Sequence, residues 1–153
     1  MSYEERAKSL GIKIPEPATP VGAYVLAVQG GTLVFTAGQG PMKGGAPAFK
    51  GKVGQDLSVE EAYEAAKLAA LNCLAAAKSV LGTIDRVERV VKVNGYVNSA
   101  PGFTDQPKVM NGASDLLVQI FGEKGRHART SVGVNELPMD ITVEVELILA
   151  CKP

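Results

Sequence analysis

Small side chains recur at helical spacing between Ser58 and Gly82, and this pattern limits the fold more than any other feature of the chain. The positions that share one helical face are Ala62, Ala65, Ala66, Ala69, Cys73, Ala76, Ala77 and Val80. Apolar residues three and four positions apart predict a helix with one buried stripe. Ser58 and Glu61 have capping-box spacing, so the helix should begin after Ser58 and run to about Leu81. Because its inner side chains are small, this helix should lie directly on a sheet, with Cys73 as a core residue rather than a reactive thiol.

Alternating residues predict that sheet. Strands are expected at 24–29, 32–37, 86–98, 130–136 and 141–151. Gly30 and Gly31 should turn the first two into a hairpin. In the longest strand the core face is predicted to carry Val87, Val91, Val93 and Val97, and in the last strand Ile141, Val143, Val145 and Leu147. The opposite face should then carry a mixed set of Glu88, Val90, Lys92, Asn94, Tyr96, Asn98, Thr142, Glu144 and Glu146.

A second long helix is expected from near Thr104 to Gly122, and a short one from Ser2 to Leu10. This order of elements predicts an α+β fold, with two helices packed on one face of a mostly antiparallel sheet. Residues 1–153 should form one domain with a short N-terminal helical extension to about residue 18. The uncovered face must meet another subunit or solvent, and oligomerisation is the natural inference. The glycine- and proline-rich stretch 38–54 is expected to be a functional or covering loop.

Composition excludes several classes of function. The 16 basic and 16 acidic residues cancel, and the pI is near 6.6, so nucleic acid is not an expected partner. No apolar run reaches the roughly 18 residues of a membrane span, and a cytoplasmic protein is expected. Cys73 and Cys151 have no neighbouring cysteines, and His127 is the one histidine, so neither a disulfide framework nor a metal cofactor is indicated.

Two charged residues near the C-terminus suggest chemistry. Arg129 has small or apolar neighbours, so a partly desolvated guanidinium could bind a carboxylate; the alternative is a surface arginine or an ion-pair partner. Glu144 could orient and deprotonate a water molecule. Glu146 is more simply interpreted as an interstrand partner of Lys92 or an edge charge. His127 has no serine or aspartate partner at a recognisable motif spacing, and we interpret it as a loop residue.

Four stretches resemble the RidA family, also called YjgF and the endoribonuclease L-PSP family. They are Gly22 to Tyr24, the TAGQGP run from Thr36 to Pro41, the strand from Val90 to Asn98, and the segment from Arg129 to Glu146, which overlaps the ARTSVGVNELP run of Ala128 to Pro138. The resemblance implies a fold similar to the bacterial chorismate mutase trimer, with ligand clefts between adjacent subunits and no cofactor. It further implies a homotrimer that hydrolyses 2-imino and 2-enamino acids, such as 2-aminoacrylate, to 2-keto acids and ammonia.

The same resemblance assigns roles to individual residues. Arg129 matches the arginine that grips the substrate carboxylate, and Glu144 matches the glutamate that orients the attacking water. Tyr24 matches a cleft-lining tyrosine, and Gly38 with Gln39 matches the glycine and glutamine of an early SGQ motif. Ser131 stands where many members have cysteine, and is expected to contact substrate.

Two other functions stay open. Ala37 replaces the serine of the SGQ motif, and Pro101 falls where members often have a cleft asparagine. These differences favour a protein that binds 2-keto acids or related carboxylates without turning them over. A third possible function is the endoribonuclease or translation-inhibitor activity that is attached by name to some members. The neutral net charge of the chain argues against this function.

Overall fold

The computed structural model describes residues 1–153, and its centre is a five-stranded sheet in the order β1-β2-β7-β5-β6. The strands are β1 (Ala27–Gly30), β2 (Leu33–Thr36), β5 (Val87–Asn98), β6 (Ala128–Val134) and β7 (Val143–Cys151). Every neighbouring pair is antiparallel except β5 and β6, which are parallel. The predicted α+β class and the mostly antiparallel sheet are therefore confirmed.

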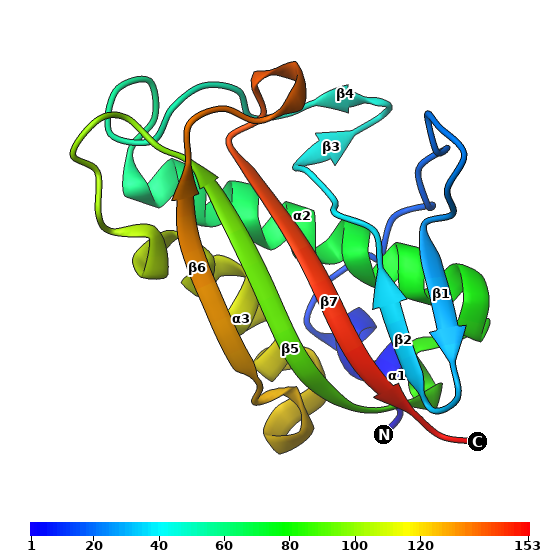
Figure 1. Ribbon diagram of the computed structural model, residues 1–153. Helices are drawn as coiled ribbons and strands as arrows, with labels where there is room; N and C mark the ends of the chain where they lie inside the picture. Colours follow the sequence, from blue (N-terminus) through cyan, green and yellow to red (C-terminus); the bar gives the residue numbers. More distant parts are fainter.

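Two long helices, α2 (Val59–Leu81) and α3 (Gln106–Phe121), cover one face of the sheet and leave the other open (Figure 1). The capping box of Ser58 and Glu61 begins α2, and the alanine stripe is fully buried, as predicted. Val80 was wrongly assigned to that stripe, because the buried series continues to Leu81 and leaves Val80 40% exposed. Cys73 lies in the core, where burial raises the pKa of its thiol to about 12. None of the helices has the length and apolar character needed to cross a membrane.

The N-terminal helix α1 (Tyr3–Ser9) packs against the end of α3. Its capping box joins Ser2 and Glu5, as predicted. The rings of Tyr3 and Phe121 meet edge to face with centroids 4.8 Å apart. Arg6 Nε donates a hydrogen bond to the carbonyl oxygen of Gln119 at 2.7 Å. The N-terminal segment is thus fixed to the helical layer rather than to the open face of the sheet.

One valine of β5 faces the opposite way from the predicted pattern. Val90 is fully buried and Val91 is 37% exposed, the reverse of the strict alternation expected from the sequence. The pairing of β5 with β7 shifts register twice, between Val87 and Arg89 and between Val90 and Lys92. A bulge of this kind inserts an extra residue and reverses the side-chain alternation locally.

The glycine-rich stretch 38–54 contains a small hairpin of β3 (Met42–Lys43) and β4 (Ala46–Pro47), which the sequence did not predict. After the hairpin, the Gly51 N–H donates to the Asp140 carbonyl at 2.8 Å, and Lys52 Nζ donates to Asn98 Oδ1 at 2.8 Å. Asn98 and Thr142, which we expected on the mixed polar face, are completely buried at this end of the sheet. The stretch therefore acts partly as a covering loop. Three short 3-10 helices complete the chain: η1 (Ile84–Arg86), η2 (Gly122–Gly125) and η3 (Pro138–Asp140).

Candidate functional site

Glu144 lies on the open face of the sheet, beside the chain that leaves β2. A methyl group built on Gly38 would lie 2.5 Å from Glu144 Oε1 and 2.8 Å from its Cδ, so the carboxylate packs directly over the Gly38 backbone. Gln39 fixes this approach through its backbone. Its N–H donates to the Val145 carbonyl at 2.8 Å, and its own carbonyl accepts from Val145 N–H at 2.9 Å. The structure thus brings Gly38, Gln39 and Glu144 together within one chain.

The two carboxylates of β7 have different surroundings. Glu146 Oε1 accepts hydrogen bonds from Tyr96 Oη at 2.7 Å and from Asn94 Nδ2 at 3.2 Å. Glu146 is therefore an interstrand partner, as we interpreted it from the sequence, but it pairs with Tyr96 and Asn94 of β5 rather than with Lys92. Glu144 forms no side-chain hydrogen bond, and burial, with a smaller contribution from the Glu146 charge, raises the pKa of its carboxyl group. Of the two, Glu144 is the carboxylate with free acceptor positions.

Arg129 lies near the start of β6 and is half-buried against α3. Its Nη1 donates to Asn111 Oδ1 at 2.9 Å and to Ser114 Oγ at 3.1 Å. Asn111 is a contact that sequence reasoning missed. Its position on an exposed turn of a helix gave no signal, because the partner strand lies 18 residues further along the chain. Pro101, at the position where family members often have a cleft asparagine, is exposed on a turn. In this chain the asparagine that contacts Arg129 is Asn111 of α3.

Ser131 and His127 lie on either side of Arg129 in the sequence. The hydroxyl of Ser131 is buried and has no hydrogen-bond partner. His127 lies in the loop before β6, as predicted, and its Nε2 lies 2.8 Å from Ser114 Oγ, a contact that the sequence did not indicate. The pair is separated by 13 residues and is assembled by the packing of α3 against β6, which no motif spacing encodes.

Arg129 and Glu144 point to opposite faces of the sheet. Arg129 pairs with Val93, which pairs with Leu147, and both of these partners are buried beneath the helices. Glu144 pairs with Tyr96, which lies on the open face with Val132. Directly paired residues share a face, so the two charged groups are on different sides of the layer. One chain therefore does not bring its arginine and its glutamate into a common site.

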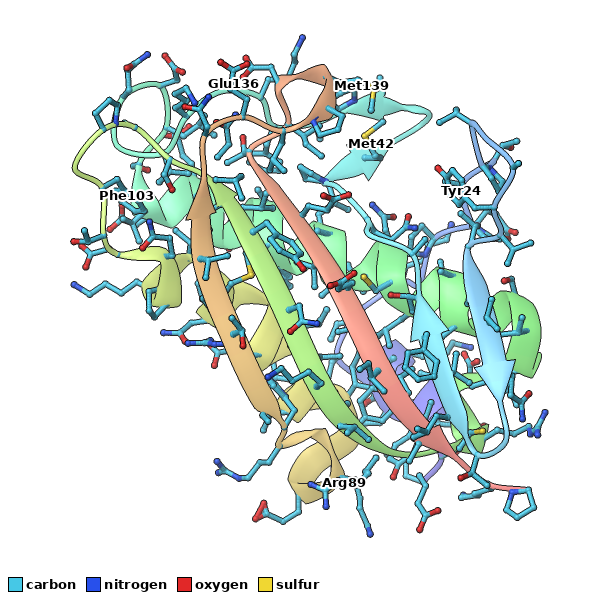
Figure 2. All side chains as sticks on the ribbon, viewed as in Figure 1. Tyr24, Met42, Arg89, Phe103, Glu136 and Met139 are labelled. Carbon is cyan, nitrogen blue, oxygen red and sulfur yellow. The ribbon has the colours of Figure 1, made fainter.

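Tyr24 lies on the segment before β1 and is 50% exposed. Figure 2 shows it at the same end of the molecule as Met42 and Met139, on the β1 side of the sheet and far from the β6 edge. Strand β1 starts at Ala27, three residues later than predicted, so Tyr24 belongs to the irregular entry segment. It has no contact with Arg129.

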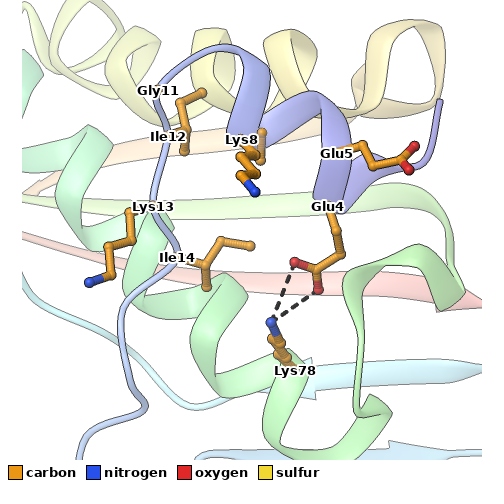
Figure 3. Close-up of a pocket in the computed structure, with 9 residues that line it drawn as sticks. Glu4, Glu5, Lys8, Gly11, Ile12, Lys13, Ile14 and Lys78 are labelled. Carbon is orange, nitrogen blue, oxygen red and sulfur yellow. Dashed lines mark hydrogen bonds and ion pairs between the residues drawn. The ribbon is translucent and has the colours of Figure 1, made fainter.

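A surface hollow of about 550 Å³ lies elsewhere, between α1 and α2 (Figure 3). Lysine and glutamate side chains line it, and Lys78 spans part of it to reach Glu4 at 3.1 Å. None of the residues singled out in the sequence lines this hollow. No three histidine, cysteine, aspartate or glutamate side chains lie close enough together to hold a metal ion.

Fold and site together define a class: a small α+β protein with an unpaired glutamate on an open sheet face and an arginine at the far sheet edge. The family model described as "YjgF/chorismate mutase-like, putative endoribonuclease" matches residues 4–150. The chain belongs to this family, and the resemblance drawn from its sequence is confirmed.

Individual relatives agree with the assignment. Protein TCP17 of Trypanosoma cruzi is 45% identical over 141 residues, which cover 92% of this chain and 88% of TCP17. A protein of unknown function from Agrobacterium tumefaciens has a similar structure, with a TM-score of 0.91, 42% identity, and coverage of 98% of this chain and 92% of that one. A structure from Shewanella oneidensis has a TM-score of 0.94 and 33% identity, with coverage of 98% and 99%.

Proposed function

We propose that this protein hydrolyses 2-imino and 2-enamino acids, such as 2-aminoacrylate, to 2-keto acids and ammonia in a cleft between subunits. Arg129 and Ser131 come from one subunit, and Glu144, Gly38, Gln39 and Tyr24 come from its neighbour. Family membership is compatible with a hydrolase, and the specific reaction is our proposal.

The observation that carries this proposal is the state of Glu144. It is a half-buried carboxylate with no hydrogen-bond partner in its own chain, and its pKa is raised, chiefly by burial. A general base works best when its pKa approaches the pH of the reaction. Glu146, two residues further on, is less free to accept a hydrogen bond from water, because Tyr96 and Asn94 already donate to its Oε1 atom.

The reaction needs an anchor, a water molecule and a proton acceptor. Arg129 holds the substrate carboxylate with charge-assisted hydrogen bonds. Glu144 takes a proton from water as the water oxygen bonds to the imine carbon. The carboxyl group then returns that proton to the nitrogen, which gives a carbinolamine. Glu144 next transfers the carbinolamine hydroxyl proton to the amino nitrogen while the carbon–oxygen double bond forms and the carbon–nitrogen bond breaks, so that a 2-keto acid and ammonia leave. An enamine must first tautomerise to the imine. Because an imine is already electrophilic, positioning and proton transfer can supply most of the rate.

Assembly of the site requires a second copy of the chain, and we propose a homotrimer. The support is that Arg129 and Glu144 lie on opposite faces, together with the character of the open face. That face carries exposed apolar side chains from three strands: Val28 is 54%, Phe35 44% and Val132 41% exposed. Burying them against other subunits would remove apolar surface from water. Light scattering at micromolar concentration should give a trimer, and a 16 kDa monomer would remove the proposed cleft.

The decisive experiment generates 2-aminoacrylate from serine with a dehydratase and follows the formation of pyruvate. The protein should accelerate pyruvate release above the uncatalysed rate. If pyruvate and other 2-keto acids stabilise the protein against heat while the rate is unchanged, it is a carboxylate-binding protein and the deaminase proposal fails.

An RNase function is less well supported. The family description includes an endoribonuclease, but the 16 acidic residues balance the 16 basic ones and give no electrostatic basis for phosphate binding. Cleavage of RNA that is salt-sensitive and lost in a His127 variant would favour that function instead.

A further inference from the structure

A continuous set of hydrogen bonds connects Arg129 to the backbone beyond α3. Arg129 Nη1 lies 3.1 Å from Ser114 Oγ, and Ser114 Oγ lies 2.8 Å from His127 Nε2. His127 Nδ1 in turn lies 2.6 Å from the carbonyl oxygen of Gly125. The resemblance to the family, as read from the sequence, assigned no role to Ser114 or His127.

Each bond in this set has one possible direction when the imidazole is neutral. A carbonyl oxygen only accepts, so His127 Nδ1 carries the hydrogen and Nε2 is the acceptor. The Ser114 hydroxyl therefore donates to Nε2, and its oxygen accepts from Arg129. Burial lowers the pKa of His127; the hydrogen bond to Gly125 opposes this with a smaller effect, and the neighbouring Arg129 charge adds a still smaller lowering. The neutral imidazole that the directions require is thus the favoured form.

The two bonds made by Nη1 decide which edge of the guanidinium remains available. Ser114 and Asn111 engage both Nη1 hydrogens, and the chain supplies no partner for Nε or Nη2. The N–H groups of Nε and Nη2 are parallel, which is the fork that binds a carboxylate through both oxygens. The α3 contacts therefore hold the guanidinium with its side-on edge directed away from the helix.

We propose that Ser114 and His127 are positioning residues for Arg129, which fix its guanidinium so that the Nε and Nη2 edge binds the substrate carboxylate. This inference rests on the proposed role of Arg129 in carboxylate binding. Ser114 is not expected to act as a nucleophile, because its oxygen accepts from the arginine and its hydrogen is given to the histidine. Both of its bonds serve to orient Arg129.

The test uses pairs of variants that keep or remove one bond. Ser114→Ala removes the acceptor, whereas Ser114→Thr keeps a hydroxyl. His127→Asn keeps a donor near Gly125 but has no group that reaches Ser114, whereas His127→Gln keeps an acceptor near the Nε2 position. Ser79→Ala is the matched control, because the Ser79 hydroxyl bonds only the Ala76 carbonyl of its own helix.

The substrate is 2-aminoacrylate generated from serine, and the ligand for binding is pyruvate. Ser114→Ala and His127→Asn should raise KM and the pyruvate Kd about 3- to 10-fold, the equivalent of one net hydrogen bond. Because carboxylate binding is the same in the ground and transition states, kcat should stay within about twofold of the wild-type value. The Thr and Gln variants should resemble wild type. The double variant Ser114→Ala/His127→Asn should be no worse than Ser114→Ala, since both break the same relay.

Three results would overturn the inference. KM values equal to that of Ser79→Ala would show that the relay does not position the arginine. A loss of kcat with unchanged KM would make Ser114 a participant in the chemistry. A third measurement needs no variant. The ¹⁵N chemical shifts of the His127 imidazole should show the hydrogen on Nδ1 and should change when pyruvate is added. The opposite tautomer, with the hydrogen on Nε2, would be incompatible with the relay.

The Arg129→Ala variant distinguishes a failure of the positioning role from a failure of the proposed carboxylate site. Unchanged pyruvate binding in that variant would remove the proposed carboxylate site itself. Loss of binding in Arg129→Ala, with wild-type KM in Ser114→Ala and His127→Asn, would leave the function standing and reject only the positioning role.

Discussion

Adding one methyl group at Gly38 should slow turnover without weakening the fold. The added carbon would lie 2.5 Å from Glu144 Oε1, whereas ordinary contacts begin near 3.4 Å, so the carboxylate must move by about 0.9 Å. The obstruction is the far end of a flexible side chain, which can turn away at little energetic cost. Gly38 has no positive φ, so alanine can adopt the same backbone conformation.

The displacement is large on the scale that catalysis tolerates. Misplacing a catalytic group by about 1 Å can cost about 100-fold in rate, and we expect a fall in kcat of that order for Gly38→Ala. Stability should be unchanged or slightly higher, because replacing glycine where alanine fits stabilises a fold by about 0.4–1 kcal/mol through the unfolded state. For a chain of this length that corresponds to a rise in Tm of roughly 1–4 °C.

The assay compares Gly38→Ala with Gly30→Ala in the pyruvate-release experiment and in thermal unfolding. Gly30 is a matched control, since it also lacks a positive φ and a methyl group there would meet nothing within 4 Å. The control should keep wild-type kcat and gain the same small stability. Wild-type kcat in Gly38→Ala, with the protein still assembled, would refute the argument that the contact at Gly38 sets the position of a catalytic Glu144.

Three further variants test the charged groups. Arg129→Lys keeps the charge and loses the planar fork, so pyruvate affinity measured by calorimetry should fall by roughly 1–3 kcal/mol; unchanged affinity would make Arg129 structural. Glu144→Gln should lower kcat about 100-fold or more while pyruvate still binds, with Glu146→Gln as the control for a carboxylate on the same strand face. Glu144→Gln should also be the more stable protein at neutral pH, because the raised pKa of Glu144 means that ionisation costs stability as pH rises above about 4.5. The pKa of His127 is lowered, so its effect on the pH dependence of stability is opposite to that of Glu144. Its contribution to stability is present above the ordinary pKa of 6.5 and is lost as pH falls through the lower folded pKa. The free energy of unfolding of His127→Gln, measured with urea, should therefore change less with pH across that range.

The helices and most strands could be predicted because their signals are local. The alanine stripe of α2 and the capping boxes of Ser2 and Ser58 depend only on neighbours along the chain, and all three are present. The inward valines of β5 were predicted only in part. A bulge depends on how two strands pair, and β7 lies more than 40 residues away, so strict alternation gave Val91 the place of Val90.

The candidate site, like the fold, could be predicted from the sequence only in part. The family resemblance separated Glu144 from Glu146, but the physical difference between them is visible only in three dimensions, in the groups that β5 and Gly38 bring against them. The contacts of Arg129 with Asn111 and Ser114 depend on the packing of α3 on β6. Sequence patterns identified residue types suited to the chemistry and predicted the face on which Glu144 lies, whereas the face on which Arg129 lies required the strand register.

That register makes assembly part of the proposed chemistry. With Arg129 beneath the helices at the β6 edge and Glu144 on the open face of β7, a folded monomer has both groups but no place where one substrate can touch them. A variant that lost the subunit contact should therefore lose the rate without losing the fold, and the rate should depend on protein concentration near the dissociation constant of the oligomer. A rate per chain that is constant through that transition would mean that one subunit suffices, and that the arginine and the glutamate do not act on the same substrate.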